Sequence, residues 1–199
     1  MNFRNWCLTL AMTAFMASAC SAGDTVVSLP APVRSGGQGI MTVLNERHTE
    51  RNFLPDPLPR QELSNLLWAA YGVNRKDGKR TVPTAMNKRN MDVYVADASG
   101  LWLYDPENNT LILKKKGDAR AGRFKEAPLM FYYAAPKGDR FAGMHAGSMY
   151  QSAALYCASV GLGNVVCYQS VGEVNNLFDF GEKEIVVSQV FGRAKKAQP

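Results

Sequence analysis

The hydrophobic residues of this chain follow a helical spacing in some segments and a strand-like spacing in others. Between Pro59 and Tyr71, leucine and alanine residues recur every three or four positions, which predicts a helix that stops at Gly72. A longer helix is predicted from Met144 to Val160, ahead of two glycines, and a short one from Ile40 to Arg47. The chain therefore contains enough helix to cover one face of a sheet.

Compact runs of β-branched, aromatic and other apolar residues predict strands between these helices. The segments Leu101–Tyr104 and Thr110–Lys114 flank the sequence Asp-Pro-Glu-Asn-Asn, which indicates a hairpin. Leu129–Ala135 is apolar throughout and suits a buried central strand. Further strands are predicted at Met91–Ala96, Asn164–Tyr168 and Ile185–Phe191. Long helices mixed with hairpin-type strands favour an α+β fold.

The first 39 residues have a different character. A basic residue, an apolar stretch over residues 8–15 and the small residues Ala17-Ser18-Ala19 are typical of a signal peptide at residues 1–19. Small residues directly before Cys20 also resemble a bacterial lipobox, and plain cleavage nearby is the alternative. We therefore expect an exported protein, periplasmic or lipid-anchored at Cys20. Residues 20–39, rich in proline and glycine, are expected to be a linker before a folded domain at 40–199.

Composition and charge narrow the classes of function. With 199 residues, 46% hydrophobic and 20% charged, the chain is an ordinary globular protein. The formal net charge of +6 suits anionic partners, but the densest basic run, 114–116, ends a predicted strand and no nucleic-acid-binding motif accompanies it. We expect no nucleic-acid partner. Two histidines and no Cys-x-x-Cys spacing argue against a metal site. Cys157 and Cys167 either pair with each other or stay free and buried.

The segment from Arg47 to Phe53 carries the clearest candidate chemistry. Arg47, Thr49 and Arg51 alternate, so in an extended segment their side chains point to one side. Two guanidinium groups and a hydroxyl suit a phosphate dianion, which arginine binds through two hydrogen bonds at once. A solvated charged loop is the alternative that the spacing alone leaves open.

This segment resembles the amino-terminal Arg-x-Ser/Thr-x-Arg/Lys-x-Phe motif of the nitroreductase-like FMN-dependent oxidoreductase family. Further similarities follow in the same order. The segment Pro83–Asn87 is similar to the family's Pro-Ser-x-x-Asn loop, and residues 147–167 are similar to its long helix, Gly-Leu-Gly turn and following strand. Residues 63–83 are most similar to the branch that contains azoline-forming dehydrogenases and their secreted bacterial relatives.

The resemblance implies a nitroreductase-like fold, with a central, mainly antiparallel sheet flanked by helices and FMN held at a homodimer interface. It assigns the phosphate to the basic segment, the ring or ribityl chain to the proline-containing loop, and backbone amides near the reactive nitrogen to the strand after the long helix. The expected FMN-binding residues are Arg47, His48, Thr49, Arg51, Pro83, Thr84, Ala85, Asn87, Val166 and Cys167. No catalytic side chain is assigned. Arg89 stands where the family often has Gln and offers a charge to an acidic substrate. The basic tail, Arg193 to Lys196, either assists the phosphate or forms a charged, frayed end.

These expectations lead to a functional hypothesis. The protein is expected to be an exported FMN-dependent oxidoreductase that moves two electrons between a donor and a small organic substrate, such as a nitro, quinone or azoline compound. NAD(P)H is not expected outside the inner membrane, so either the donor differs or the protein oxidises its substrate. The alternative is a non-catalytic, lipid-tethered protein of the same fold that binds flavin or another ligand.

Overall fold

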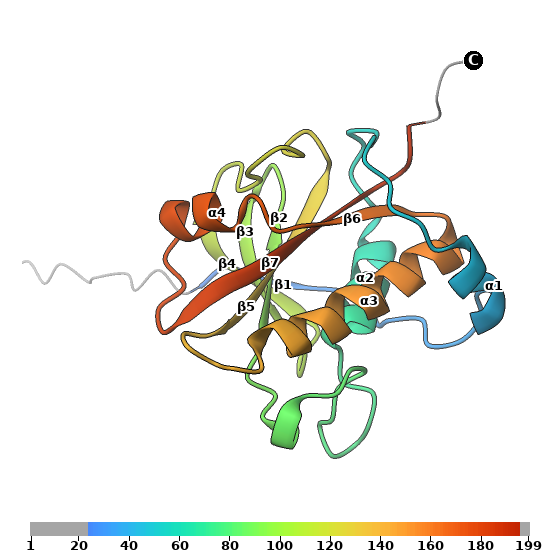
Figure 1. The fold of residues 1–199 in the computed structure, drawn as a ribbon, viewed down its shortest axis with the longest axis horizontal. Helices are drawn as coiled ribbons and strands as arrows, with labels where there is room; N and C mark the ends of the chain where they lie inside the picture. The colour runs from blue at the N-terminus through green and yellow to red at the C-terminus, as the bar shows by residue number, and fades with distance from the viewer. Residues whose placement is uncertain (1–23, 196–199) are drawn as a thin grey trace, which may run out of the picture.

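A seven-stranded sheet forms the centre of the protein in a computed structural model that describes residues 24–195 (Figure 1). The strand order is β1-β4-β3-β2-β5-β7-β6, and every neighbouring pair is antiparallel. In chain order the elements are β1 (Val26–Ser28), α1 (Ile40–Glu46), α2 (Arg60–Tyr71), the 3-10 helix η1 (Ala85–Asn87), β2 (Asp92–Ala96), β3 (Gly100–Asp105), β4 (Thr110–Lys116), β5 (Leu129–Pro136), α3 (Ala142–Val160), β6 (Gly163–Cys167), α4 (Val171–Leu177) and β7 (Lys183–Gly192). The predicted α+β class is confirmed.

The strands and helices predicted from the hydrophobic pattern are all present, with ends that differ by a few residues. Helix α3 ends at Gly161, whose φ of 71° is the left-handed conformation that glycine adopts at helix ends. Three short elements, β1, η1 and α4, were not predicted. β1 and η1 have three residues each, too few for a periodic pattern, and α4 has seven residues, of which it buries one, Val174.

The predicted linker at residues 20–39 is wrong for the part that the structure describes. Val26–Ser28 pairs with β4 as an edge strand, and the N–H of Val33 donates to Asn65 Oδ1 on α2 at 2.8 Å. The two valines favour a strand. The prolines that follow lack a backbone N–H, so they leave no donor without a partner where the chain passes α2. The folded domain therefore begins by residue 26, not 40. The predicted signal peptide and Cys20 lie outside the described residues.

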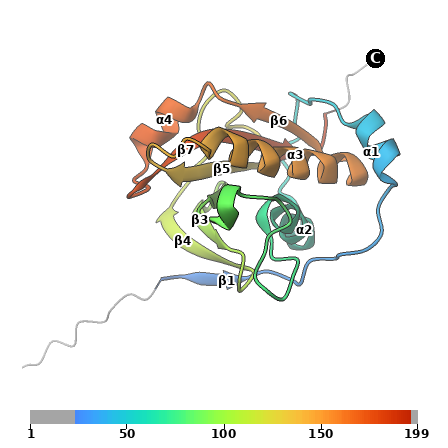
Figure 2. The ribbon, with the colours of Figure 1, turned by 60° about the horizontal axis from the view of Figure 1, so that its bottom comes forward.

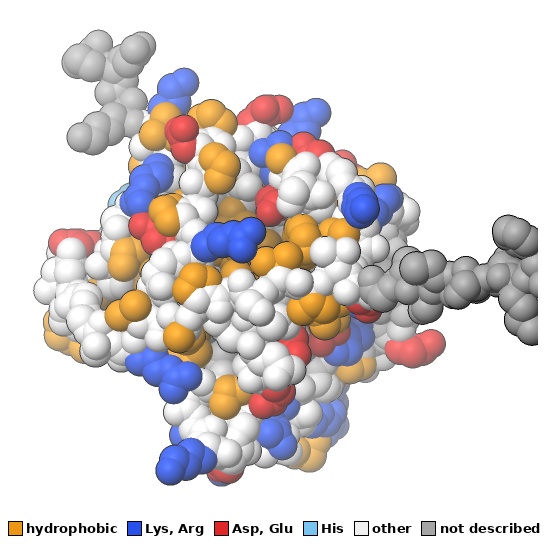
Figure 3. Space-filling model, turned by 180° about the vertical axis from the view of Figure 1, so that it is seen from behind, with side chains coloured by type: hydrophobic (Ala, Val, Ile, Leu, Met, Phe, Trp, Pro, Cys, Tyr) orange, Lys and Arg blue, Asp and Glu red, His pale blue; other side chains and the backbone are white. Residues whose placement is uncertain are grey.

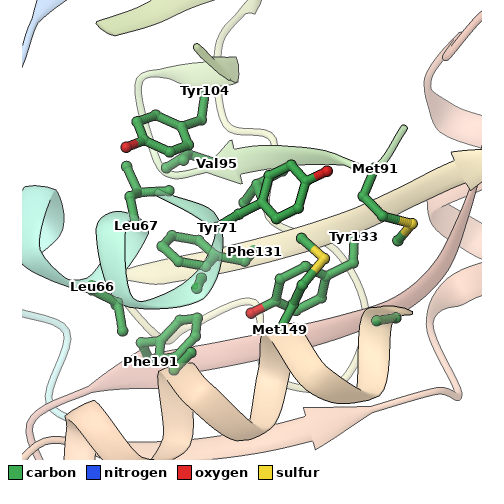
Figure 4. Close-up of a cluster of buried hydrophobic side chains, with 14 of the residues drawn as sticks. Leu66, Leu67, Tyr71, Met91, Val95, Tyr104, Phe131, Tyr133, Met149 and Phe191 are labelled. Atoms are coloured by element: carbon green, nitrogen blue, oxygen red, sulfur yellow. The ribbon is translucent and has the colours of Figure 1, made fainter. Parts of the chain in front are cut away.

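The main core lies between the sheet and helices α2 and α3. Figure 4 shows its large side chains: α2 and α3 supply Leu66, Leu67, Tyr71 and Met149, the strands supply Val95, Tyr104, Phe131, Tyr133 and Phe191, and Met91 comes from the residue before β2. A second core on the other face contains the alternate residues of β5, Met130 and Tyr132, with α4 against them. Strand β5 is thus buried on both faces, which is why its sequence is a continuous apolar run.

A buried polar network ties α3 to three strands. The Tyr133 hydroxyl on β5 donates to Gln189 Oε1 on β7 at 2.6 Å. Gln189 Nε2 donates to the Tyr150 carbonyl on α3 and to Asn164 Oδ1 on β6, at 3.1 and 3.0 Å. Because buried polar groups are costly without partners, this network fixes the edge strand β6 relative to α3. Figure 2 shows α3 lying lengthwise along the sheet, with α1 at its carboxyl end.

Candidate functional site

The basic motif, which is residues 47–53, leaves the end of α1 and continues the sheet. Phe53 forms an antiparallel β-bridge with Ala194, just beyond β7. The N–H of Lys195 donates to the Asn52 carbonyl at 2.9 Å. These backbone contacts hold the end of the motif in an extended conformation, and they place the basic tail beside it.

Glu50 holds the middle of the motif, although nothing in the sequence distinguishes it from a solvated acid. Its Oε1 accepts the N–H groups of Arg51 and Asn52, both at 2.7 Å, and its own N–H donates to the Asn164 carbonyl on β6 at 2.9 Å. The residue next to Asn164 is Gly163, where a methyl group would lie 2.7 and 2.9 Å from Glu50 Cγ and Cβ. Gly163 therefore leaves the space in which Glu50 anchors the motif to β6.

The guanidinium groups of the motif are free to bind an anion. Within residues 24–195, neither Arg47 nor Arg51 makes an ion pair, whereas Arg193 is paired with Glu62 at 2.6 Å. Thr49 is exposed, so its hydroxyl is accessible as well. His48 differs, because its Nδ1 lies 2.8 Å from the Glu46 carbonyl and its ring lines a separate hollow at the end of α3.

Additional positive charge lies next to Arg51. A hollow of about 260 Å³ is lined by Arg51, Arg123 and Lys195, with Glu126 as the acidic residue in its wall. Of the basic tail, Lys195 thus lies beside the motif, Arg193 is engaged by Glu62, and Lys196 falls outside the described residues. The surplus of positive charge favours an anionic ligand here.

The edge strand β6 turns part of its backbone toward this region. The Asn164 carbonyl accepts from Glu50 on the side away from β7, whereas the Cys167 carbonyl accepts the Ser188 hydroxyl of β7 at 2.7 Å. Because backbone groups alternate along an antiparallel strand, the N–H and C=O of Val166 also face away from β7. Val166 is 39% exposed. Its N–H is therefore a donor that no neighbouring strand uses.

Three of the predicted residues meet in one hollow of about 300 Å³. Arg51 lines it together with Val166 and Cys167. The rest of its wall is Val165 on β6, Tyr168 and Gln169 in the turn after β6, and Arg123 and Phe124 in the loop before β5; sequence reasoning did not connect this last loop with the site. An exposed loop residue carries no periodic signal, so only the tertiary structure reveals these neighbours.

The predicted loop Pro83–Asn87 lies elsewhere. The Ala85 N–H donates to His145 Nε2 on the first turn of α3 at 2.8 Å. Thr84 serves the loop itself, because its carbonyl accepts the Asn87 N–H and its Oγ1 accepts the Arg89 N–H, at 3.0 and 3.1 Å. The Thr84 hydroxyl proton and the exposed Asn87 side chain are left to contact a ligand.

The two predicted groups occupy opposite ends of α3 within one chain. Helix α3 has 19 residues and is therefore about 28 Å long. Its first turn contacts the loop that carries η1, and its last turn lies beside α1 and the basic motif (Figures 1 and 2). One chain does not bring the Pro83–Asn87 loop to a ligand held by Arg47 and Arg51.

The remaining reactive groups are not arranged for covalent or metal chemistry. Cys157 and Cys167 are both free and buried, so of the two alternatives they do not pair. Burial raises the pKa of the Cys157 thiol well above its usual value, which disfavours the nucleophilic thiolate. Across residues 24–195 no three acidic, histidine or cysteine side chains gather as a metal site would require. Over the same range, no helix combines the length and apolar character needed to cross a bilayer.

The face of the molecule opposite the view of Figure 1 has hydrophobic side chains gathered near its centre, with basic side chains among them (Figure 3). A separate apolar hollow of about 210 Å³ is lined by Pro55, Pro57, Leu58, Leu63, Asp97, Ala98, Ser99, Arg120, Pro128 and Leu129. It contains none of the ten residues expected to bind the cofactor.

Comparisons with known proteins show which family and fold this chain shares. The model of the nitroreductase family matches residues 44–193. A nitroreductase-like protein of Methanocaldococcus jannaschii is 30% identical over 148 residues, which cover 62% of this chain and 75% of that protein. The crystal structure of a nitroreductase-like protein of Ralstonia eutropha has a TM-score of 0.78 and 36% identity, covering 86% of this chain and 90% of that one.

More distant structures share the fold. A Bacteroides fragilis nitroreductase with bound FMN has a TM-score of 0.57 and 13% identity, covering 79% of this chain and 89% of that one. A chain of the E. coli microcin synthetase McbBCD complex has a TM-score of 0.64 and 18% identity, covering 95% of this chain and 85% of that one. The expected nitroreductase-like fold is confirmed.

Proposed function

Because this chain belongs to the nitroreductase family, we propose that it is an FMN-dependent oxidoreductase that works as a homodimer. One observation carries the cofactor assignment. Two guanidinium groups without ion pairs, those of Arg47 and Arg51, lie on a motif that Glu50 anchors to β6, and Arg51 shares a hollow with the outward-facing backbone of Val166. A distant member of the same fold holds FMN, which supports the same ligand here.

The residues present fit both ends of this cofactor. Arg47, Thr49 and Arg51 supply the charges and hydroxyl for a phosphate dianion, and the nearby Lys195 adds to the positive field. FMN supplies two-electron redox chemistry when bound. The protein's part is to bind, orient and polarise: the Val166 N–H is a backbone donor held by β6, and the Arg51 guanidinium adds a positive charge at the same hollow, so both favour negative charge there.

The homodimer follows from the separation of the two groups. Since the Pro83–Asn87 loop lies about a helix length from the basic motif, it reaches the cofactor only from the partner subunit. Each of the two sites then combines the basic motif of one protomer with Thr84 and Asn87 of the other. This arrangement uses the exposed loop, which otherwise faces solvent.

The substrate is proposed to be a small organic nitro, quinone or azoline compound. Because residues 63–83 resemble azoline-forming dehydrogenases, oxidation of the substrate is one of the reactions to test. A non-catalytic flavin-binding protein is the second candidate. It is favoured by Arg89, which replaces the family's frequent Gln and donates to the Gly78 carbonyl at 3.2 Å.

Export and attachment to lipid at Cys20 remain part of the proposal. They rest on the basic residue, apolar stretch and small residues that precede Cys20. The mass of the mature amino terminus tests them directly: a diacylglycerol-modified Cys20 supports the anchor, and an intact Met1 in envelope fractions contradicts it.

The visible spectrum of the purified protein tests the cofactor assignment. We expect a flavin spectrum after incubation with FMN, bleached by anaerobic dithionite and restored by a nitro, quinone or azoline acceptor; restoration by none of these favours the non-catalytic candidate. The R47A/R51A variant should lose FMN affinity by at least 100-fold, since each charge-assisted hydrogen bond contributes about 1.5–3 kcal/mol. The control R60A/K116A removes the same charge from exposed positions outside the site. Equal losses in both variants would reject a specific phosphate site.

Mixed dimers test the shared site. Chains carrying R47A/R51A are combined with chains carrying T84A/N87A, and the heterodimer is isolated by two different tags. If each site uses both subunits, the heterodimer has one undamaged site and binds one FMN. If each site lies within one chain, both sites are damaged and no FMN binds.

A further inference from the structure

His145 is a buried histidine that the proposed function does not yet use. It lies on the first turn of α3, is 1% exposed, and accepts the Ala85 N–H through Nε2 at 2.8 Å. A nitrogen that accepts carries no proton, so the neutral ring has its proton on Nδ1. Among the described residues Nδ1 has no hydrogen-bond partner. Among these residues the imidazole therefore makes one hydrogen bond, the one from the Ala85 N–H to Nε2.

The loop that His145 contacts has an unusual backbone. Met86, Asn87 and Arg89 have φ values of 52°, 53° and 49°, in the left-handed region that residues other than glycine seldom adopt. Each such residue raises the free energy of the loop by about 1 kcal/mol or more, unless the surrounding structure holds it. The loop therefore needs attachments that fix this conformation.

Among the described residues, the bond to His145 is the hydrogen bond by which a buried side chain holds the backbone of Pro83–Asn87. The hydrogen bonds of Thr84 to Asn87 and Arg89 lie within the loop. Beyond Asn87, Lys88 lies 3.8 Å from Asp139, whose side chain is 4% exposed, and Asn90 donates to the same carboxylate at 2.9 Å. A buried hydrogen bond is screened less by water, so the His145 bond restrains the Thr84–Asn87 part of the loop directly.

The imidazole itself has little freedom to move. Its ring stacks on Phe141, with the ring centroids 6.1 Å apart and an interplanar angle of 28°. Two cations also contact the Phe141 ring, since Arg140 and Lys88 lie 4.7 and 5.4 Å from its centroid. The acceptor nitrogen is thus presented to Ala85 in one orientation.

We propose that His145 is a positioning residue for the cofactor site of the partner subunit. By accepting the Ala85 N–H it holds Thr84 and Asn87 in the strained conformation in which they contact the cofactor. This inference rests on the proposed function for its last step. The attachment of the loop to His145 can be tested without any cofactor.

Backbone hydrogen exchange in the cofactor-free protein tests the attachment. In H145L the Ala85 amide should exchange at least 10-fold faster, whereas H145Q, whose Oε1 can accept in place of Nε2, should stay within about 3-fold of the wild type. H145N keeps a polar side chain too short to reach Ala85, so it should behave as H145L does and serves if H145L fails to fold. Unchanged exchange at Ala85 in both H145L and H145N would overturn the proposal.

A matched control comes from the same helix. The Ser152 hydroxyl donates to the Ala69 carbonyl at 2.7 Å and joins α3 to α2. S152A removes one tertiary hydrogen bond from α3, as H145L does, but should leave exchange at Ala85 unchanged. Faster exchange in S152A would show that any loosening of α3 frees the loop, which contradicts a specific role for His145.

The rate of FMN dissociation tests the link to the cofactor. We expect release about 10-fold faster from H145L and H145N, with H145Q close to the wild type. Faster exchange at Ala85 with unchanged FMN release would overturn the positioning role in the cofactor site. A wild-type protein that binds no FMN, while exchange at Ala85 still depends on residue 145, would refute the proposed function but not the attachment of the loop.

Discussion

A single methyl group at Gly163 should weaken cofactor binding from outside the site. The G163A substitution places Cβ 2.7 and 2.9 Å from two carbons of Glu50, so Glu50 must move by about 0.7 Å to reach ordinary contact distance. Such a shift disturbs the two 2.7 Å hydrogen bonds that Glu50 accepts from Arg51 and Asn52. Since a hydrogen bond to a charged group contributes about 1.5–3 kcal/mol, and these are exposed, we expect FMN affinity to fall 5- to 30-fold.

Titration of FMN fluorescence with the protein measures this effect. G172A is the control, because a methyl group at Gly172 on α4 meets nothing within 4 Å. A double-mutant cycle assigns the cause: the E50G background lacks the two closest atoms and keeps the Gly192 carbonyl oxygen at 3.3 Å, so G163A should cost less affinity there than in the wild type. Wild-type affinity in G163A, or an equal loss with and without Glu50, would refute the role of this contact.

Three further predictions concern stability and reactivity. Q189L leaves the Tyr133 hydroxyl and Asn164 Oδ1 without their partner, and should lower the free energy of unfolding by about 2–5 kcal/mol in urea titrations; a loss under 1 kcal/mol would contradict it. Burial raises the pKa of Tyr94 to about 12. Its contribution to stability is therefore complete below pH 10, the unfolded pKa, and lost as pH rises toward 12, so Y94F should melt with a flatter dependence over this interval. Cys157, whose pKa burial raises, should react with a thiol reagent at pH 8 only after unfolding; labelling of the native protein, mapped by mass spectrometry, would disprove this.

The long elements were predictable because their patterns are long enough to be read. Leu129–Ala135 is apolar at every position, which only a strand covered on both faces requires, and β5 is such a strand. Val26–Ser28 was not predictable in the same way. Two valines beside prolines fit a linker or an edge strand equally well, and only the pairing with β4 decides between them.

The residues of the candidate site differ in the same way: some lie within one short segment of the sequence, and others are brought together by the fold. Arg47, Thr49 and Arg51 could be proposed from the sequence because their alternation lies within five residues and resembles the phosphate motif of a known family. Glu50, Arg123 and His145 were not, since their roles depend on contacts with β6, with a hollow and with a distant loop. Hydrogen bonds across the fold leave no periodic trace in the sequence.

If Cys20 carries lipid, the position of β1 limits the distance between the folded domain and the membrane. It occupies one edge of the sheet, and β6 with its hollow occupies the other. Cys20 precedes Val26 by about six residues, and a chain of that length reaches at most about 20 Å when fully extended. If Cys20 carries lipid, as proposed, β1 lies within about 20 Å of the bilayer surface, and β6 with its hollow lies at the edge of the sheet that is farthest from this attachment.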